Sequence, residues 1–367
     1  MIVTLLISVL VVSVIAGALA LLLVIAEFFF ANYGECTLTI NDEKNVTVTG
    51  GDSLLSTLSG QKIFIPSACG GKGTCGLCKV KVLDGAGPLL PTEEPYLDKD
   101  EIKSKVRLSC QVKVRNDLKI HIPEEIFNIK EYECKCEEIR DLTHDIKLFR
   151  FKLTDPPEIK YVSGQFMQLL TPAYGKNKEE VYRAYSIASN PAEKNIIEFI
   201  IRLMPGGICT TYCFEYLKKG DAVRMNGPYG EFRLTDTNAE MIWIAGGSGM
   251  APFVSMLNQM KNTNNQRKVT FYFGANKVRE LFLLDEMKQF ENDLSNFKFV
   301  PVVYKPDEDE TWDGQTGLVT EAVGRNNKSL TDIEGYLCGS PGMIDASIKV
   351  LEELGMSEEK IFYDKFA

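Results

Sequence analysis

Four cysteines are spaced as ligands of an iron–sulfur cluster. Cys69, Cys75 and Cys78 lie in the glycine-rich segment SACGGKGTCGLCKVKV, and Cys110 follows in RLSCQV. This C-x5-C-x2-C loop with one distant cysteine differs by one residue from the C-x4-C-x2-C…C spacing of plant-type [2Fe–2S] sites. Glycines suit such a loop, because thiolates must converge and backbone N–H groups must approach the sulfurs. We therefore predict a [2Fe–2S] cluster held by these four residues.

Zinc is the alternative metal for this loop. Structural zinc sites usually combine two short pairs of ligands, whereas here three cysteines share one loop. The chain has ten cysteines but only two histidines, which disfavours a histidine-rich metal site and Ser-His-Asp catalysis. Four cysteines in one pattern and six scattered ones fit a reducing compartment better than a disulfide framework.

A second set of residues suits a flavin. Arg183, Tyr185 and Ser186 lie in the extended segment VYRAYSIASNP, where period-2 alternation puts the arginine and the tyrosine on one face. The ring can cover an isoalloxazine, the hydroxyl can bond its N5 and the guanidinium can pair with a phosphate. Taken alone, R-x-Y-S is also an ordinary strand sequence. A glycine and threonine turn before a helix-like segment is a natural pyrophosphate site, and it supplies Gly207, Thr210 and Thr211.

A third set suits a nucleotide. The segment EMIWIAGGSGMAPFVSMLNQM reads as a buried strand, a glycine-rich turn and a helix that opens near Pro252, although the strict G-x-G-x-x-G fingerprint is absent. Further strands alternate with helices, which predicts a parallel sheet with its ligand at the carboxyl ends of the strands. Cys338 ends one such strand in YLCGSPGM. A buried small side chain is the alternative role for this cysteine.

The elements that must position these residues follow from periodicity. Alternation predicts a hairpin in TLTINDEKNVTVTG, a short helix in SLLSTLSGQ, and strands in CKVKVLDG and SCQVKVRNDLKIHI. From about residue 131 the sequence becomes rich in strands, as in YECKCEEI, IKLFRFKL and GQFMQLLTP. We expect a multidomain fold: a transmembrane anchor over 1–30, a β-grasp [2Fe–2S] ferredoxin-like domain over 34–127, an antiparallel β-barrel FAD domain over 128–236, and an α/β parallel-sheet NAD(H)-binding domain over 237–367.

The first 26 residues carry no charge. As a helix they would cover about 37 Å, more than the roughly 30 Å hydrocarbon core of a bilayer. A secretory signal peptide is the alternative, but it would need a basic start and a shorter apolar run. We therefore expect a single-pass anchor. The net charge of −9 over 367 residues argues against a general nucleic-acid binder.

The flavin and nucleotide segments, in this order, resemble the ferredoxin–NADP reductase superfamily. The resemblance implies that Cys338 lies beside the nicotinamide and that the penultimate Phe366 shields the flavin, although a chain end can also simply fray. Lys277 and Arg279 follow the strand that meets the adenosine ribose in such enzymes. These two cations could bind the 2′-phosphate of NADPH, so that nucleotide stays an alternative, but we favour NADH. The superfamily's G-G-x-G-x-A-P turn is carried here by Gly246, Gly247, Gly249, Ala251 and Pro252.

Along nearly its whole length the chain is similar to the family of F subunits of the sodium-translocating NADH:quinone reductases, in HIPEEIFNIKEYEC, RAYSIASNP, GGSGMAP and the closing YLCGSPGM…LEELGMSEEKIFYDKF. The resemblance implies an enzyme that passes hydride from NADH to FAD and single electrons through the [2Fe–2S] cluster to a membrane acceptor. It also implies other membrane subunits, a quinone or a membrane redox protein as acceptor, and redox domains on the cytoplasmic side of the inner membrane. A stand-alone NADH dehydrogenase, an oxygenase reductase and a tethered electron carrier are the alternatives.

Overall fold

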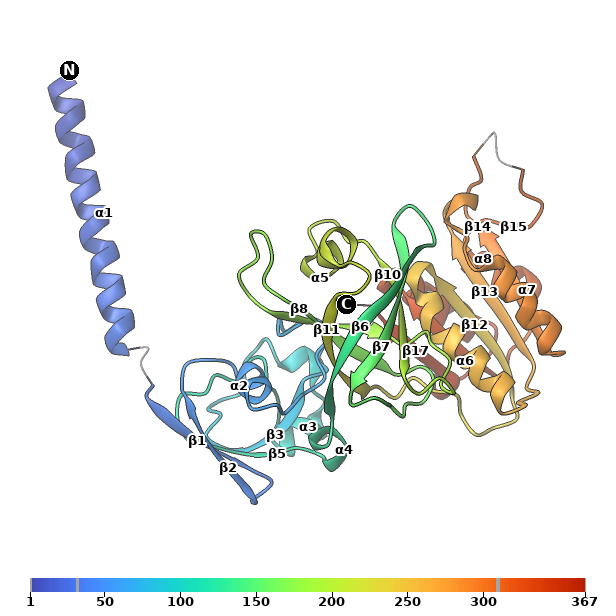
Figure 1. Cartoon of the computed structure of the whole chain (residues 1–367), viewed down its shortest axis with the longest axis horizontal. Helices are drawn as coiled ribbons and strands as arrows, with labels where there is room; N and C mark the ends of the chain where they lie inside the picture. The colour runs from blue at the N-terminus through green and yellow to red at the C-terminus, as the bar shows by residue number, and fades with distance from the viewer. Residues whose placement is uncertain (1, 31–32, 308–310, 367) are drawn as a thin grey trace. The chain divides into compact units, whose positions relative to one another are not determined.

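The computed structural model describes residues 2–30, 33–307 and 311–366 (Figure 1). The chain forms two compact units. The first comprises Met1–Ile65 and Gly71–Asn128, and the second comprises Pro66–Gly70 and Ile129–Ala367. The second unit therefore contains a five-residue piece of the cysteine loop together with the flavin and nucleotide segments.

The first unit is built on a mixed five-stranded sheet in the order β2-β1-β5-β3-β4, in which β1 and β5 are parallel. Leu38, Ile40, Leu54, Leu58 and Ile120 are fully buried between this sheet and the short helices. This is the expected β-grasp arrangement. Its elements are β1 (Glu35–Ile40), β2 (Lys44–Thr49), α2 (Leu54–Gly60), β3 (Lys79–Asp84), η1 (Glu94–Tyr96), α3 (Lys99–Lys103), β4 (Val106–Leu108), β5 (Leu118–His121) and α4 (Glu124–Phe127).

The strand expected over SCQVKVRNDLKIHI is mostly wrong. Only Leu118–His121 is strand. The preceding backbone is irregular, because its N–H and C=O groups form hydrogen bonds with the residues at the start of α2 instead of with a neighbouring strand. The Leu54 N–H donates to Val112 O at 2.7 Å, and the Val114 N–H donates to Asp52 O at 2.9 Å. The alternation of apolar residues in this stretch therefore comes from burial of Val112 and Val114 beside the start of α2, and not from a strand.

Helix α1 runs over Ile2–Phe30. Its side chains are described at Ile7 and over residues 9–24, and the large apolar ones there are all exposed, from 47% at Val11 to 66% at Leu10. Counted over the described residues, no helix is both long and apolar enough to cross a membrane. The transmembrane anchor stays a prediction.

The flavin segment folds into a six-stranded antiparallel sheet in the order β10-β7-β6-β11-β8-β9. An antiparallel bridge between Ile187 and Phe199 joins the end of β9 to β10, so the two edges of the sheet meet and the expected barrel closes. Its elements are β6 (Lys130–Asp141), β7 (Ile146–Asp155), β8 (Phe166–Thr171), β9 (Val181–Ser186), β10 (Ile196–Arg202), α5 (Ile208–Thr211), the π-turn η2 (Tyr212–Tyr216) and β11 (Ala222–Tyr229).

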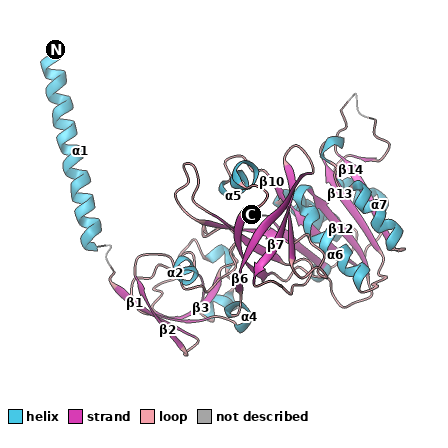
Figure 2. Cartoon of the chain, viewed as in Figure 1, coloured by secondary structure: helices cyan, strands magenta, loops and turns pink. Residues whose placement is uncertain are grey.

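The nucleotide segment folds into a six-stranded sheet in the order β15-β14-β13-β12-β16-β17, and every pairing in it is parallel, as expected. Figure 2 shows β12, β13 and β14 of this sheet together with α6 and α7. Its elements are β12 (Glu240–Gly246), η3 (Gly247–Gly249), α6 (Met250–Asn262), β13 (Val269–Ala275), η4 (Val278–Glu280), α7 (Leu284–Asp293), β14 (Phe297–Val303), β15 (Gln315–Thr316), α8 (Val319–Asn326), β16 (Ile333–Gly339), α9 (Pro341–Glu353), η5 (Glu358–Lys360) and β17 (Ile361–Lys365).

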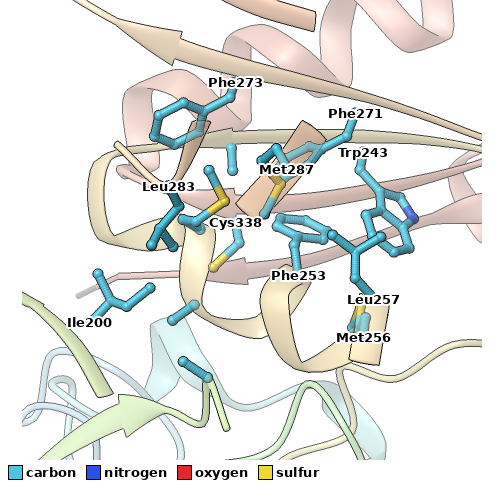
Figure 3. Close-up of a cluster of buried hydrophobic side chains, with 14 of the residues drawn as sticks. Ile200, Trp243, Phe253, Met256, Leu257, Phe271, Phe273, Leu283, Met287 and Cys338 are labelled. Atoms are coloured by element: carbon cyan, nitrogen blue, oxygen red, sulfur yellow. The ribbon is translucent and has the colours of Figure 1, made fainter. Parts of the chain in front are cut away.

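An aromatic core packs strands of this sheet against α6 (Figure 3). The rings of Trp243 and Phe253 stack with centroids 5.1 Å apart, and the Phe253 and Phe271 centroids lie 4.9 Å apart. Cys338 belongs to the same buried cluster. The core therefore fixes α6, which follows the glycine-rich turn, against the strand that carries the predicted nicotinamide cysteine.

Candidate functional site

Two of the predicted cluster ligands lie side by side in the first unit. The thiols of Cys78 and Cys110 are hydrogen-bonded, and this contact together with burial raises the pKa of Cys78. Each iron of a [2Fe–2S] cluster takes two thiolates, so a close pair is what one iron needs, and a bound iron would hold both thiols deprotonated. In the described residues, no three His, Cys, Asp or Glu side chains group closely enough to hold a single metal ion.

The loop around these cysteines has the backbone conformation of glycine at several positions, which suits a cluster. Gly73 and Gly76 have φ of +74° and +69°, a conformation that favours glycine. A Cβ on Gly73 would lie 2.5 Å from Gln111 Nε2, which itself donates to Cys110 Sγ at 3.6 Å. Gln111 is thus a hydrogen-bond donor to the sulfur of a predicted ligand, a contact typical of cluster sites. Sequence patterns carried no signal for it beyond its position after Cys110.

The predicted flavin residues lie on β9, an edge strand of the barrel sheet. Pairing with β8 places Arg183 opposite Leu169 and Tyr185 opposite Met167. The half-buried Tyr185 ring lies 5.7 Å from the Phe199 ring, centroid to centroid. Burial raises the pKa of Tyr185, so its hydroxyl stays protonated as a donor.

Two cysteines outside the predicted sites are packed beside this tyrosine. Cys209 and Cys213 are both at most 2% exposed. A hydrogen bond from the Cys213 thiol lowers the pKa of Cys209 to about 7, and Tyr185 also bonds this sulfur. They support the tyrosine as buried packing thiols.

The predicted phosphate turn is present but compact. Gly207 is the residue before α5, which is a single turn of four residues and continues into η2. The Thr210 hydroxyl is used within the turn: it donates to Gly207 O and accepts from Met204 N, at 3.3 and 3.2 Å. Thr210 therefore shapes the turn, and the Thr211 side chain is half-buried beside it.

Two predicted residues, Ser186 of the barrel and Cys338 of the parallel sheet, lie close to a third residue that was not predicted, Asp364. Ser186 Oγ donates to Asp364 Oδ2 at 3.0 Å. In the β16–β17 pairing Asp364 lies opposite Cys338, which is fully buried. Burial raises the pKa of Cys338, and the nearby Asp364 carboxylate raises it further. The Asp364 side chain was missed by the sequence patterns, because only strand register places it there.

The glycine-rich turn packs directly on this cysteine. A Cβ on Gly249 would lie 2.2 Å from Cys338 O, so only glycine fits there. Gly247 has φ of +55°, and Ala251 and Pro252 are buried in the first turns of α6. Phe366 follows β17, and its N–H donates to Gly339 O at 3.1 Å. The predicted nucleotide residues thus converge at the carboxyl ends of β12 and β16.

The two cations expected near the adenosine share one acidic partner. Lys277 Nζ forms a short ion pair with Asp307 Oδ1, and Arg279 Nη1 lies 4.0 Å from Asp307 Oδ2. These residues follow β13 and β14, at the same edge of the sheet as the glycine-rich turn. The hydrogen bond from Lys277 lowers the pKa of Asp307, so the carboxylate remains charged at neutral pH.

Together these features fit a flavin and a nicotinamide nucleotide. An aromatic ring, a hydroxyl and a guanidinium lie on one barrel strand, and a glycine turn with no room for a side chain at Gly249 lies at the edge of the parallel sheet. A separate cleft of about 460 Å³ is lined by charged side chains of the barrel and of α6 and α7, including Arg140, Arg150 and Glu286. Its lining contains none of the predicted site residues.

Comparisons with known proteins agree with this division. Residues 38–115 match the family of 2Fe-2S iron-sulfur cluster binding domains, residues 133–234 match oxidoreductase FAD-binding domains, and residues 243–349 match oxidoreductase NAD-binding domains. Among solved structures, the chain is similar to the cytochrome P450 reductase GcoB of Amycolatopsis, with a TM-score of 0.72 and 26% identity over 90% of this chain and 98% of that one. The ferredoxin reductase of carbazole 1,9a-dioxygenase gives a TM-score of 0.69 and 25% identity over 91% and 98%.

Full-length relatives extend the likeness. The F subunit of the Na(+)-translocating NADH-quinone reductase of Neisseria gonorrhoeae is 36% identical over 96% of this chain and 97% of its own length. Its counterpart in a Marinomonas species is 36% identical over 95% of each chain. The chain therefore belongs to the family of F subunits of the Na(+)-translocating NADH-quinone reductases.

Proposed function

We propose that this protein oxidises NADH and passes the electrons through FAD and a [2Fe–2S] cluster to an acceptor at the membrane. The observation that carries the proposal is that Ser186, Asp364 and Cys338 lie close together beside the glycine-rich turn. The strand proposed to hold the flavin therefore lies next to the sheet edge proposed to hold the nucleotide. When bound, FAD accepts hydride from the nicotinamide and the cluster carries electrons one at a time. No general base is needed, which suits a chain with two histidines.

Each residue then has a defined task. Tyr185 covers the flavin ring and Ser186 bonds its reactive edge, while Arg183, Gly207, Thr210 and Thr211 hold or shape the phosphate site. The turn from Gly246 to Pro252 holds the nicotinamide nucleotide, with Cys338 beside its ring and Phe366 covering the flavin. Cys69, Cys75, Cys78 and Cys110 ligate the cluster.

Asp364 orients the Ser186 hydroxyl. A carboxylate accepts only, so the hydrogen of that hydroxyl points to Asp364 when the acid is ionised. A protonated Asp364 can instead donate, which would free the serine hydrogen for the flavin. Burial raises the pKa of Asp364, so the fold favours the protonated form more than water does.

We also propose that α1 is a single-pass anchor in the cytoplasmic membrane, with the redox domains, bounded at 34–127, 128–236 and 237–367, on the cytoplasmic side. Its exposed apolar side chains support this. An anchor would restrict the search for the acceptor to the membrane. The family supports a quinone or a membrane redox subunit of a sodium-translocating complex as acceptor. Removal of residues 1–30 should release the protein from membranes into the soluble fraction and leave NADH-dependent flavin reduction intact.

A second candidate is a reductase that supplies an oxygenase. It is favoured by the likeness to reductases of a cytochrome P450 and of a dioxygenase along nine-tenths of the chain. The two candidates share the NADH-to-cluster chemistry and differ in the acceptor. Reoxidation of the reduced protein by membrane quinone analogues, compared with reoxidation by soluble oxygenase components, separates them.

The first test is an anaerobic titration of the purified, detergent-solubilised protein with NADH and then NADPH. We expect NADH to bleach the flavin absorbance and to produce the EPR signal of a reduced [2Fe–2S] cluster. Flavin bleaching without that signal would remove the cluster from the proposal. No bleaching with either nucleotide would remove the dehydrogenase.

A further inference from the structure

Five residues of the cysteine loop group with the flavin barrel. Pro66–Gly70 belongs to the same compact unit as β6–β11, although the residues before and after it belong to the first unit. The segment includes Cys69, one of the proposed cluster ligands. The contacts that bind this segment to the barrel therefore bear on how electrons leave the flavin.

The first contact is a buried hydrogen bond. The Ser67 N–H donates to Gln168 Oε1 at 3.1 Å, and both side chains are 3% exposed. Gln168 lies on β8, next to the flavin strand. Its Nε2 donates to Asn226 Oδ1 at 2.9 Å, and Tyr229 donates to the same oxygen at 2.6 Å. Asn226 thus fixes which end of the Gln168 amide faces Ser67.

The second contact is a close approach that only glycine permits. Gly70 has φ of +63°, and a Cβ on it would lie 1.6 Å from Arg183 Nη1 and 2.8 Å from Tyr182 O. Arg183 Nη1 in turn donates to Tyr182 O at 2.8 Å. The guanidinium therefore packs on the backbone next to Cys69, and Arg183 is two residues from the proposed flavin ring partner Tyr185.

We infer that Gln168 and Arg183 are positioning residues that dock Pro66–Gly70 on β8 and β9, so that Cys69 is held beside the flavin strand for electron transfer. The inference rests on the proposed function. Each NADH would supply a hydride, that is two electrons, and FAD, when bound, would give them up one at a time to the cluster and from there to the membrane acceptor, while its protons return to solvent. Because electron transfer slows steeply with distance, the docked segment sets the rate of both steps without touching hydride transfer.

The test is Gln168→Met, which keeps the side-chain length and removes the acceptor. Hydrogen exchange of the Ser67 amide, measured on the full chain without nucleotide, should accelerate about tenfold, as the loss of one buried hydrogen bond predicts. In stopped-flow experiments on the holoprotein, NADH should bleach the flavin at the wild-type rate, and the cluster should become reduced about tenfold more slowly.

The matched control is Gln165→Met. Gln165 precedes the same strand, but its Oε1 accepts from Val162 N at 2.9 Å and its Nε2 donates to Gly230 O at 3.4 Å. It should leave Ser67 exchange and cluster reduction unchanged. Equal effects of the two variants, or unchanged Ser67 exchange and cluster reduction in Gln168→Met, would overturn the inference.

Gly70→Ala tests the docking from the other contact and serves where Gln168→Met does not fold. Its Cβ forces the Arg183 guanidinium away, so in the FAD-loaded fraction cluster reduction should slow more than flavin reduction does. Wild-type cluster reduction in this variant would also overturn the inference. If NADH fails to bleach the flavin of the wild-type protein, the proposed function fails instead, and Ser67 exchange still reports the docking.

Discussion

Ser186 and Asp364 are 178 residues apart in the chain, and a 3.0 Å hydrogen bond joins their side chains. Ser186 ends the flavin strand β9, and Asp364 lies on β17 opposite Cys338. This bond connects the barrel to the nucleotide sheet at the point where, in the proposed function, hydride crosses from the nucleotide to the flavin. It therefore bears on both the rate of flavin reduction and the stability of the fold.

Removal of either partner should slow flavin reduction. We expect Ser186→Ala and Asp364→Ala each to lower the rate by about tenfold, since each loses one hydrogen bond that orients the reacting groups. If the two residues act as one unit, the double variant should be no slower than the slower single variant. Stopped-flow absorbance with NADH measures all three rates. Effects that multiply would mean that the residues act independently.

Asp364 should also make the stability of the folded protein depend on pH. Burial raises the pKa of Asp364 above its usual 3.8, so the folded state binds this proton more tightly than the unfolded state does. The resulting stabilisation is full below pH 3.8 and is lost as pH rises through the raised pKa. Asp364→Asn mimics the protonated form, so the variant should gain in Tm relative to wild type as pH rises.

Melting curves of both proteins across that range check the sign. Asp345→Asn is the control, because Asp345 is an exposed acid that pairs with the neighbouring Lys365 at 2.6 Å. A Tm difference between Asp364→Asn and wild type that stays constant with pH would contradict the assignment.

Preference between the two nicotinamide nucleotides should depend on Asp307. Its carboxylate pairs with both Lys277 and Arg279, which offsets part of their positive charge and repels a 2′-phosphate. Asp307→Asn should therefore raise kcat/KM for NADPH relative to NADH, by about tenfold. Asp293→Asn, which breaks a similar 2.7 Å ion pair with Lys261 at the end of α6, should leave the ratio unchanged. An unchanged ratio in Asp307→Asn would place the 2′-position elsewhere.

The cluster and the flavin should be separable. In Cys75→Ala the [2Fe–2S] EPR signal should vanish while NADH still bleaches the flavin at the wild-type rate, since the flavin residues lie on the barrel. Cys36→Ala is the matched control, because Cys36 is a buried cysteine of the same unit whose thiol faces Tyr33 O at 3.8 Å. It should keep the signal. Loss of flavin reduction in Cys75→Ala would show that the two halves depend on each other.

Sequence patterns predicted the parts of the site that are local in the chain. The cysteine spacing, the R-x-Y-S strand and the glycine turn each occupy a single segment, and the strand of R-x-Y-S and the strand and helix around the glycine turn have the expected type. Asp364 was not predictable, because only the parallel register of β16 and β17 brings it to Cys338. The role of Gln168 was hidden for the same reason: it lies 101 residues from Ser67. The strand predicted over 109–122 was wrong before Leu118, because a buried irregular segment can also show alternating apolar residues.

Stability of the first unit should depend on one buried ion pair. Arg107 donates to Glu93 at 2.6 Å with both side chains at most 7% exposed, and the same carboxylate accepts from Leu108 N at 2.9 Å. Arg107→Met leaves a buried carboxylate without its partner, which should cost about 3–5 kcal/mol in the free energy of unfolding. Lys79→Met breaks the more exposed 2.7 Å pair with Glu101 and should cost less than about 1 kcal/mol. Urea unfolding of the holoprotein, followed by cluster absorbance, measures both. β4 leads directly to Ser109 and Cys110. Equal losses of unfolding free energy in the two variants would therefore mean that the buried ion pair does not stabilise β4, the strand before the predicted ligand Cys110.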